Sequence, residues 1–170
     1  MAIRKSVKLT YERLQEVLHY SFQTGTFRWA KRISIRIVVG KVAGRLDRHG
    51  HRYITIDGER FIAHRLAWFH VYGEWPSDQI DHINGNPDDN RLCNLRDSSQ
   101  AENTCNRGKS SNNTSGYKGV TWHKKAKKWL AQIGANGQHY YLGLFDTAEE
   151  AHAAYCEAAV RLHGEFARFE

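Results

Sequence analysis

The sequence predicts a modular α+β protein: a strand-rich N-terminal region, a strand–loop–strand–helix core, and a C-terminal three-stranded antiparallel sheet packed on one helix. Three observations support this. Short strand patterns flanking turn dipeptides fill the N-terminal third, an Asn-rich loop lies between two short strand candidates in the middle, and aromatic, β-branched segments precede a long alanine-rich stripe near the end. The 41% hydrophobic content and five Trp are sufficient for small cores.

The N-terminal third contains one amphipathic helix and two hairpins. Apolar residues at Leu9, Leu14, Val17 and Leu18 favour a helix over residues 10–19. Residues 22–29 read as a hairpin around Thr24-Gly25, and residues 53–56 and 60–62 as strands around the Asp57-Gly58 turn. Four arginines lie on or near these strands, where they could contact the phosphate groups of a polyanion: Arg45, Arg48, Arg52 and Arg60. Four histidines are interpreted as structural or phosphate-contacting rather than as metal ligands: His49, His51, His64 and His70.

The central segment reads as strand, loop, strand and helix. Residues 79–83 and 92–96 are the two strand candidates, and residues 84–90 are rich in Asn, Gly, Pro and Asp, which favour turns. Ser99 followed by Glu102 forms a capping box for a helix that runs to about Asn106 and is closed by Gly108.

Polar residues in this unit suit metal-assisted chemistry. Asp81 and Asn103 offer the hard oxygen ligands that Mg²⁺ or Mn²⁺ prefers, and His82 beside the ion could take a proton from water as a general base. Asn94 could orient the His82 ring or brace the loop by hydrogen bonds. Asn103 on a short helix could instead make only a local hydrogen bond. Three further residues are interpreted as turn formers: Asn84, Asn86 and Asn90.

This segment resembles the HNH nuclease family, in the variant of phage- and intron-encoded homing endonucleases where Asp replaces the first His. The resemblance covers residues 63–107, from AHRLAWFHVYGEWP through the Asp-His, Asn-Leu-Arg and Gln-x-x-Asn elements. It implies that Asp81 and Asn103 bind the metal, that His82 is the base and that Asn94 is the orienting or structural residue. Because Cys93, Cys105 and Cys156 form no Cys-x-x-Cys, no structural zinc is expected.

The C-terminal third is predicted to contain three strands and a helix. A turn at residues 134–137 separates the second and third strands, Thr147 with Glu150 forms a second capping box, and Gly164 ends the helix. An alanine-rich stripe between them is interpreted as core. The polar segment 108–116 is expected to be a flexible linker.

The pattern YKGV, KKWLAQI and YLGLFDTAEEA is similar to the plant APETALA-type (ethylene-response-factor-like) DNA-binding domain, whose sheet enters the major groove. Thr121, Gly134 and Tyr141 depart from the plant pattern, so base specificity does not transfer. Trp129 is expected to pack against the helix rather than stack on a base. By position, the resemblance places these residues at or near DNA: Lys118, Thr121, His123, Lys128, Gln132 and Tyr141. Between Lys118 and Lys128, three further lysines make this segment basic enough to bind phosphate groups: Lys124, Lys125 and Lys127.

Charge and composition favour a polyanionic partner. The net charge is +7, with a basic block at residues 1–77, an acidic block at 78–107 and a mildly basic block at 108–170. Three cysteines, no secretory h-region and no bilayer-length apolar run predict a cytoplasmic protein of a bacterium or phage-infected cell. A linker that tethers two DNA contacts favours a monomer.

Together these features predict a homing-type, site-specific DNA endonuclease that hydrolyses a phosphodiester of double-stranded DNA with Mg²⁺ or Mn²⁺. One active site per chain favours nicking over a double-strand break. The alternative is a DNA-binding regulator with a vestigial nuclease fold. The expected organisation is an N-terminal DNA-contacting region (1–62), the nuclease core (63–107), the linker (108–116) and the APETALA-type domain (117–170).

Overall fold

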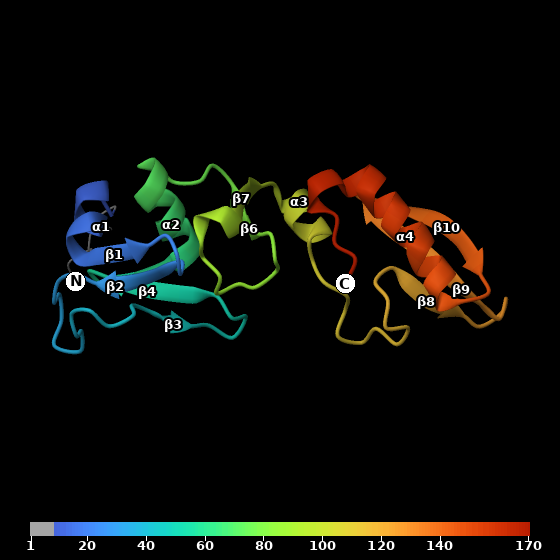
Figure 1. The fold of residues 1–170 in the computed structure, drawn as a ribbon, viewed down its shortest axis with the longest axis horizontal. Helices are drawn as coiled ribbons and strands as arrows, with labels where there is room; N and C mark the ends of the chain where they lie inside the picture. Colours follow the sequence, from blue (N-terminus) through green and yellow to red (C-terminus); the bar gives the residue numbers. More distant parts are fainter. Residues whose placement is uncertain (1–8) are drawn as a thin grey trace, which may run out of the picture. The chain divides into compact units, whose positions relative to one another are not determined.

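A computed structural model describes residues 9–170 of the protein (Figure 1). The chain divides into two compact units, with the boundary between Asp97 and Ser98. Residues 1–8, the start of the expected region 1–62, lie outside the described residues. Among the residues described, no helix is long and apolar enough to cross a membrane.

In the part of the first unit that the structure describes, from residue 9 onward, there are two helices and seven short strands, the last of which crosses the unit boundary. Its elements are α1 (Tyr11–Val17), β1 (Leu18–Ser21), β2 (Thr26–Trp29), β3 (Arg45–Leu46), β4 (Arg52–Ile56), β5 (Glu59–Ile62), α2 (Ala63–Tyr72), β6 (Gln79–His82), the 3₁₀ turn η1 (Leu92–Asn94) and β7 (Leu95–Ser98). The strands form three sheets, ordered β1-β2, β3-β4-β5 and β6-β7.

The core of the first unit lies between the helices and the sheets. Ile54 and Ile56 come from β4, and Leu14 and Leu66 come from the two helices; all four are buried in one cluster. The expected helix over residues 10–19 is shorter than predicted, because Leu18 adopts an extended conformation and pairs with Trp29 at the start of β1. The predicted turn at Asp57-Gly58 is confirmed, with positive φ at both residues.

The second unit is a three-stranded antiparallel sheet covered on one face by a helix, as predicted (Figure 1). Its elements are α3 (Gln100–Cys105), β8 (Val120–His123), β9 (Lys128–Ala135), β10 (Gln138–Phe145), α4 (Ala148–His163) and the 3₁₀ turn η2 (Gly164–Phe166). Both capping boxes form, at Ser99–Glu102 and at Thr147–Glu150. Within the 108–116 segment, the Ser115 hydroxyl donates to the carbonyls of Tyr117 and Val120.

Close packing of the helix on the sheet requires glycine at position 119. Gly119 has φ +74°, and a Cβ there would overlap the Tyr155 ring and lie 2.8 Å from Gln132 O. Gly137 has the same φ but open space around it. A comparison of alanine substitutions at these two positions therefore separates the free-energy cost of a left-handed backbone from the cost of a steric overlap.

We expect Gly119→Ala to destabilise the second unit by about 1–3 kcal/mol more than Gly137→Ala, since only the first substitution adds an overlap with packed atoms. Urea unfolding followed by circular dichroism on both variants and the wild type measures the difference. Equal losses of stability in the two variants would show that the Tyr155 ring does not pack tightly on residue 119.

Candidate functional site

Asp81 and His82 lie side by side at the end of β6, and both are buried. Arg96 on the adjacent strand β7 donates from Nε and Nη2 to Asp81 Oδ2, at 2.8 and 2.7 Å. Asp81 is only 4% exposed. Removing a carboxylate from water is costly unless a cation is close, so the Arg96 guanidinium is what allows this carboxylate to be buried.

His82 is held in a buried and neutral form. Its Nε2 lies 3.4 Å from Asn90 Oδ1. Burial lowers the pKa of His82 below its usual value, and this effect outweighs the hydrogen bond with Asn90 and the nearby charge of Asp81, which raise the pKa. A neutral imidazole at pH 7 carries the lone pair that a general base needs.

Asn90 is a site residue that sequence reasoning missed. It is 1% exposed, and besides its contact with His82 its Nδ2 donates to Asp88 O. Tyr20 from β1 donates to Asn90 O at 2.7 Å and fixes this part of the loop. In the sequence, Asn90 is one of several asparagines in a turn-forming run, and nothing local distinguishes it from its neighbours.

Asn94 braces the loop between β6 and β7. Its Oδ1 accepts from Asn84 N at 2.9 Å, and its Nδ2 donates to Asp89 O at 2.8 Å and to Asn84 Oδ1 at 3.1 Å. Of the two roles predicted for Asn94, these contacts match the bracing role. Arg52 of β4 also binds this loop, donating from Nε and Nη2 to the two Asp88 oxygens at 2.8 Å.

The predicted metal ligands lie in different units. Asp81 belongs to the first unit, and Asn103 lies half-buried on α3 of the second unit. The carboxylate and carboxamide oxygens of these residues are the donor type that Mg²⁺ and Mn²⁺ bind. The donor set therefore fits the ion that the sequence implies, and the pairing of the two residues stays a prediction.

The four arginines proposed to contact DNA differ in their surroundings. Arg45 and Arg60 lie on the face of the β3-β4-β5 sheet opposite Ile54, because their cross-strand partners are Tyr53 and Thr55. Arg60 lies 4.2 Å above the Tyr53 ring. Arg48 is exposed. Arg52 is engaged with Asp88, so its side chain is committed to holding the loop.

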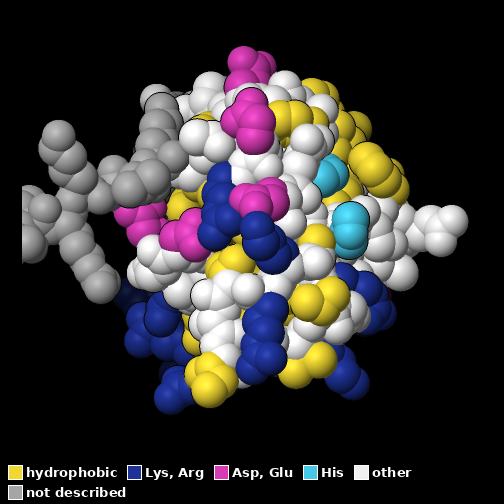
Figure 2. Space-filling view, turned by 90° about the vertical axis from the view of Figure 1, so that its left-hand side faces the viewer, with side chains coloured by type: hydrophobic (Ala, Val, Ile, Leu, Met, Phe, Trp, Pro, Cys, Tyr) yellow, Lys and Arg dark blue, Asp and Glu magenta, His cyan; other side chains and the backbone are white. Residues whose placement is uncertain are grey.

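One face of the first unit carries a concentration of positive charge. Figure 2 shows Lys and Arg side chains gathered mainly in the lower half of that face, with Asp and Glu mostly above them. The segment between β2 and β4 supplies several exposed basic residues: Lys31, Arg32, Arg36, Lys41, Arg45 and Arg48. Phosphate groups are attracted to such a surface.

In the second unit, the sheet face away from α4 collects most of the predicted DNA contacts. Val120 and Ala131 are paired and buried beneath α4, so the alternating positions point to the open face. The register places five predicted residues there: Thr121, His123, Lys128, Gln132 and Tyr141. Lys124, Lys125 and Lys127 are exposed in the adjoining turn. Trp129 packs with the core beneath α4, as predicted.

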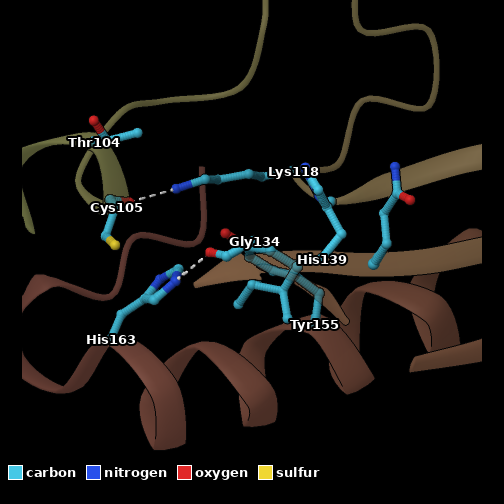
Figure 3. Close-up of a pocket in the computed structure, with 10 residues that line it drawn as sticks. Thr104, Cys105, Lys118, Gly134, His139, Tyr155 and His163 are labelled. Carbon is cyan, nitrogen blue, oxygen red and sulfur yellow. Dashed lines mark hydrogen bonds between the residues drawn. The ribbon is translucent and has the colours of Figure 1, made fainter. Parts of the chain in front are cut away.

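Lys118 lies in a pocket of about 300 Å³ that Gln132 and Tyr155 also line (Figure 3). Its Nζ donates to Cys105 O at 2.9 Å and lies 5.9 Å from the centre of the Tyr155 ring. Burial and the positive charge of Arg168 lower the pKa of Lys118 to about 8. Its ammonium group thus ties α3 to the start of β8 within the second unit, a role that the sequence did not indicate.

Comparison with known proteins finds two family matches along the chain, and the first of them continues past the boundary between the two units. Residues 61–105 match the HNH endonuclease family model, and residues 115–165 match the AP2 domain model. Protein 3.8 of Escherichia phage T7 is 36% identical over 107 residues, which cover 62% of this chain and 88% of that protein.

The plant relatives share only one part of the chain. The AP2-like ethylene-responsive transcription factors TOE2 and ANT of Arabidopsis thaliana are 36% and 46% identical over 92 and 50 residues, covering 54% and 28% of this chain. These matches span only 18% and 9% of the two plant proteins. No solved structure matches the chain significantly. The chain belongs to the HNH endonuclease family as a relative of phage T7 protein 3.8, and it carries an AP2 domain in its C-terminal part.

Proposed function

We propose that this protein is a homing-type, site-specific DNA endonuclease that hydrolyses one phosphodiester bond with Mg²⁺ or Mn²⁺ and nicks one strand. The observation that carries the proposal is the buried Asp81–His82 pair, in which a neutral imidazole adjoins an ionised carboxylate. The HNH and AP2 matches support the assignment to nuclease chemistry and DNA binding.

In this proposal, Asp81 and Asn103 hold the ion through oxygen atoms. When bound, the ion supplies Lewis-acid stabilisation of the scissile phosphate and of the leaving 3′ oxygen. His82 takes the proton from the attacking water, which is possible because its imidazole is neutral at pH 7. Arg96 positions the Asp81 carboxylate, and Asn90 orients the His82 ring. Asn94 keeps the loop between β6 and β7 in shape.

The open face of the C-terminal sheet and its basic turn would bind the DNA duplex. Lys124, Lys125 and Lys127 suit phosphate contacts, and Thr121, His123, Gln132 and Tyr141 are placed to approach bases or sugars. Lys128 takes part in an ion pair with Asp146 at 3.0 Å on the same unit. In the first unit, Arg45, Arg48 and Arg60 are better placed for phosphate than Arg52.

One active site per chain favours a nick by a monomer in the cytoplasm of a bacterial or phage-infected cell.

One observation favours a second candidate function. The guanidinium of Arg96 already neutralises Asp81, as it would in a chain that keeps the fold but has no need of metal. Such a protein would be a DNA-binding regulator. Incubating plasmid DNA with the protein and MgCl₂, then mapping the ends, distinguishes the two: metal-dependent nicks support the nuclease, and binding without cleavage supports the regulator.

We predict that His82→Ala lowers the single-turnover cleavage rate at least about a hundredfold, because general-base catalysis contributes that much or more. DNA affinity should stay close to wild type. His49→Ala, an exposed histidine of the same unit, is the matched control and should cut normally. A wild-type rate in the His82 variant would remove its assignment as the base.

We predict that Asp81→Ala and Asn103→Ala both weaken magnesium-supported cleavage, and that Asp81→Ala is worse because it removes a charged ligand. Cleavage rates across a MgCl₂ titration measure this. The exposed Asp78 provides the control variant Asp78→Ala. If the magnesium curve of either variant overlays that of wild type, the replaced residue is not a metal ligand.

Replacing Lys124, Lys125 and Lys127 together with Ala should weaken DNA binding and make its dependence on salt shallower, by about 0.9 in logarithmic slope for each phosphate that the protein no longer neutralises. Cleavage at saturating protein should survive, since these lysines lie outside the unit that contains Asp81 and His82. Binding titrations at several NaCl concentrations test this, with Arg161→Ala on α4 as the control. Unchanged affinity and slope would show that this turn does not grip DNA.

A further inference from the structure

Three histidines from separate elements meet in the first unit. His51 directly precedes β4, His64 lies in the first turn of α2, and His82 ends β6. One ring nitrogen of each lies within 4.8 Å of the other two. The ring centroids are 5.0 Å apart for His64 and His82, 5.7 Å for His51 and His64, and 6.0 Å for His51 and His82. Among residues 9–170, no other group of three His, Cys, Asp or Glu side chains comes together like this.

Ordinary packing does not account well for this arrangement. His64 is only 7% exposed, and its Nδ1 is buried and makes no hydrogen bond. A buried polar atom without a partner costs about 1–3 kcal/mol. Such a cost is commonly retained where the atom serves a ligand.

The donor type of the cluster suits zinc. Imidazole nitrogen is a preferred ligand of this ion, and His51, His64 and His82 each offer one within 4.8 Å of the other two. A carboxylate also lies near the cluster, with Asp47 Oδ2 3.9 Å from His51 Nδ1.

The spacing of the three nitrogens can be compared with that of a tetrahedral zinc site. With zinc–nitrogen distances near 2.0–2.1 Å, the nitrogens of such a site lie about 3.4 Å apart, so three rings already within 4.8 Å need to close by about 1 Å or slightly more. His64 and His82 are buried, while His51 is half-exposed, so His51 gives the site its access to solvent. A water molecule there would complete four-coordination.

We propose that His51, His64 and His82 bind one zinc ion, and that zinc bound there inhibits the nuclease by occupying the imidazole of His82. The inhibitory part rests on the proposed function, and the binding part does not. The site is chemically distinct from the one assigned to Mg²⁺ or Mn²⁺, because its ligands are nitrogens rather than the oxygens of Asp81 and Asn103. It also departs from the sequence-based interpretation of His51 and His64 as structural or phosphate-contacting residues.

Direct metal binding tests the site without reference to cleavage. Full-length protein treated with chelator is titrated with Co²⁺, whose visible absorption reports tetrahedral nitrogen coordination, and with Zn²⁺ by calorimetry. We expect one equivalent to bind to wild type. His51→Gln should bind at least about tenfold more weakly, because it removes one of three ligands. His49→Gln, an exposed histidine two residues away, should bind as wild type does.

His51 is the informative position because it is only half-buried, so its replacement leaves the packing of the unit intact. Absence of stoichiometric binding by wild type overturns the site. Equal affinities of wild type and His51→Gln overturn it as well, because the ion would then be held elsewhere.

A cleavage assay tests the inhibition separately. Plasmid nicking in MgCl₂ is measured with added ZnCl₂, and each variant is normalised to its own zinc-free rate. We expect zinc to inhibit wild type and His49→Gln at the concentration that fills the site, and His51→Gln to need at least about tenfold more. Zinc that fills the site and leaves nicking unchanged overturns the inhibition. Zinc binding by a protein that never cuts DNA leaves the metal site standing and rejects the proposed function instead.

Discussion

A buried ion pair joins β6 and β7, the two paired strands on either side of the Asn-rich loop. Arg96 on β7 holds Asp81 near the end of β6. Loss of that guanidinium would remove the ion-pair partner of a carboxylate that is only 4% exposed, and breaking a buried ion pair in this way typically costs about 3–5 kcal/mol. Because His82 directly follows Asp81 in β6, the ion pair between Arg96 and Asp81 also helps to fix the position of the His82 side chain. The position of the proposed base therefore depends on the pairing of its neighbour.

The loop that completes this site is held by the N-terminal region of the first unit. Tyr20 of β1 binds the carbonyl of Asn90, and Arg52 of β4 binds Asp88 with two hydrogen bonds. Gly25, at the turn between β1 and β2, has no room for a Cβ against the backbone of Asn90 and Arg91. The shape of the loop at residues 88–91 thus rests on contacts from residues that precede the matched segment. This gives the preceding strands a structural task beside any contact with DNA.

Local interactions explain which parts of the fold were predictable from the sequence. The turn at Asp57-Gly58 and the capping boxes at residues 99–102 and 147–150 depend on residues close together in the chain. The turn expected at residues 134–137 is shorter than predicted and lies at Asn136-Gly137, because β9 continues to Ala135. Long-range contacts decided the rest. The expected strand at 92–96 begins as the 3₁₀ turn η1, and only Leu95 onward pairs with β6. Likewise, Asp81 and His82 were identifiable as a motif, whereas the roles of Asn90 and Lys118 depend on His82 and Cys105, partners that lie in other elements earlier in the chain.

The burial of His82 favours two different uses of its imidazole: proton transfer as a general base, and binding of a metal ion. Removing the imidazole from water keeps it unprotonated at neutral pH, which a general base requires. The same removal of water leaves a neutral nitrogen ligand beside two more imidazoles, His51 and His64, which a borderline-soft metal prefers over the oxygens that suit magnesium. Asp81 and His82 are adjacent in the chain, yet the proposed magnesium site uses Asp81 and the proposed zinc site uses His82. In this scheme zinc would occupy the imidazole that acts as the base, whereas Mg²⁺ or Mn²⁺ on oxygen ligands would leave that imidazole able to take a proton.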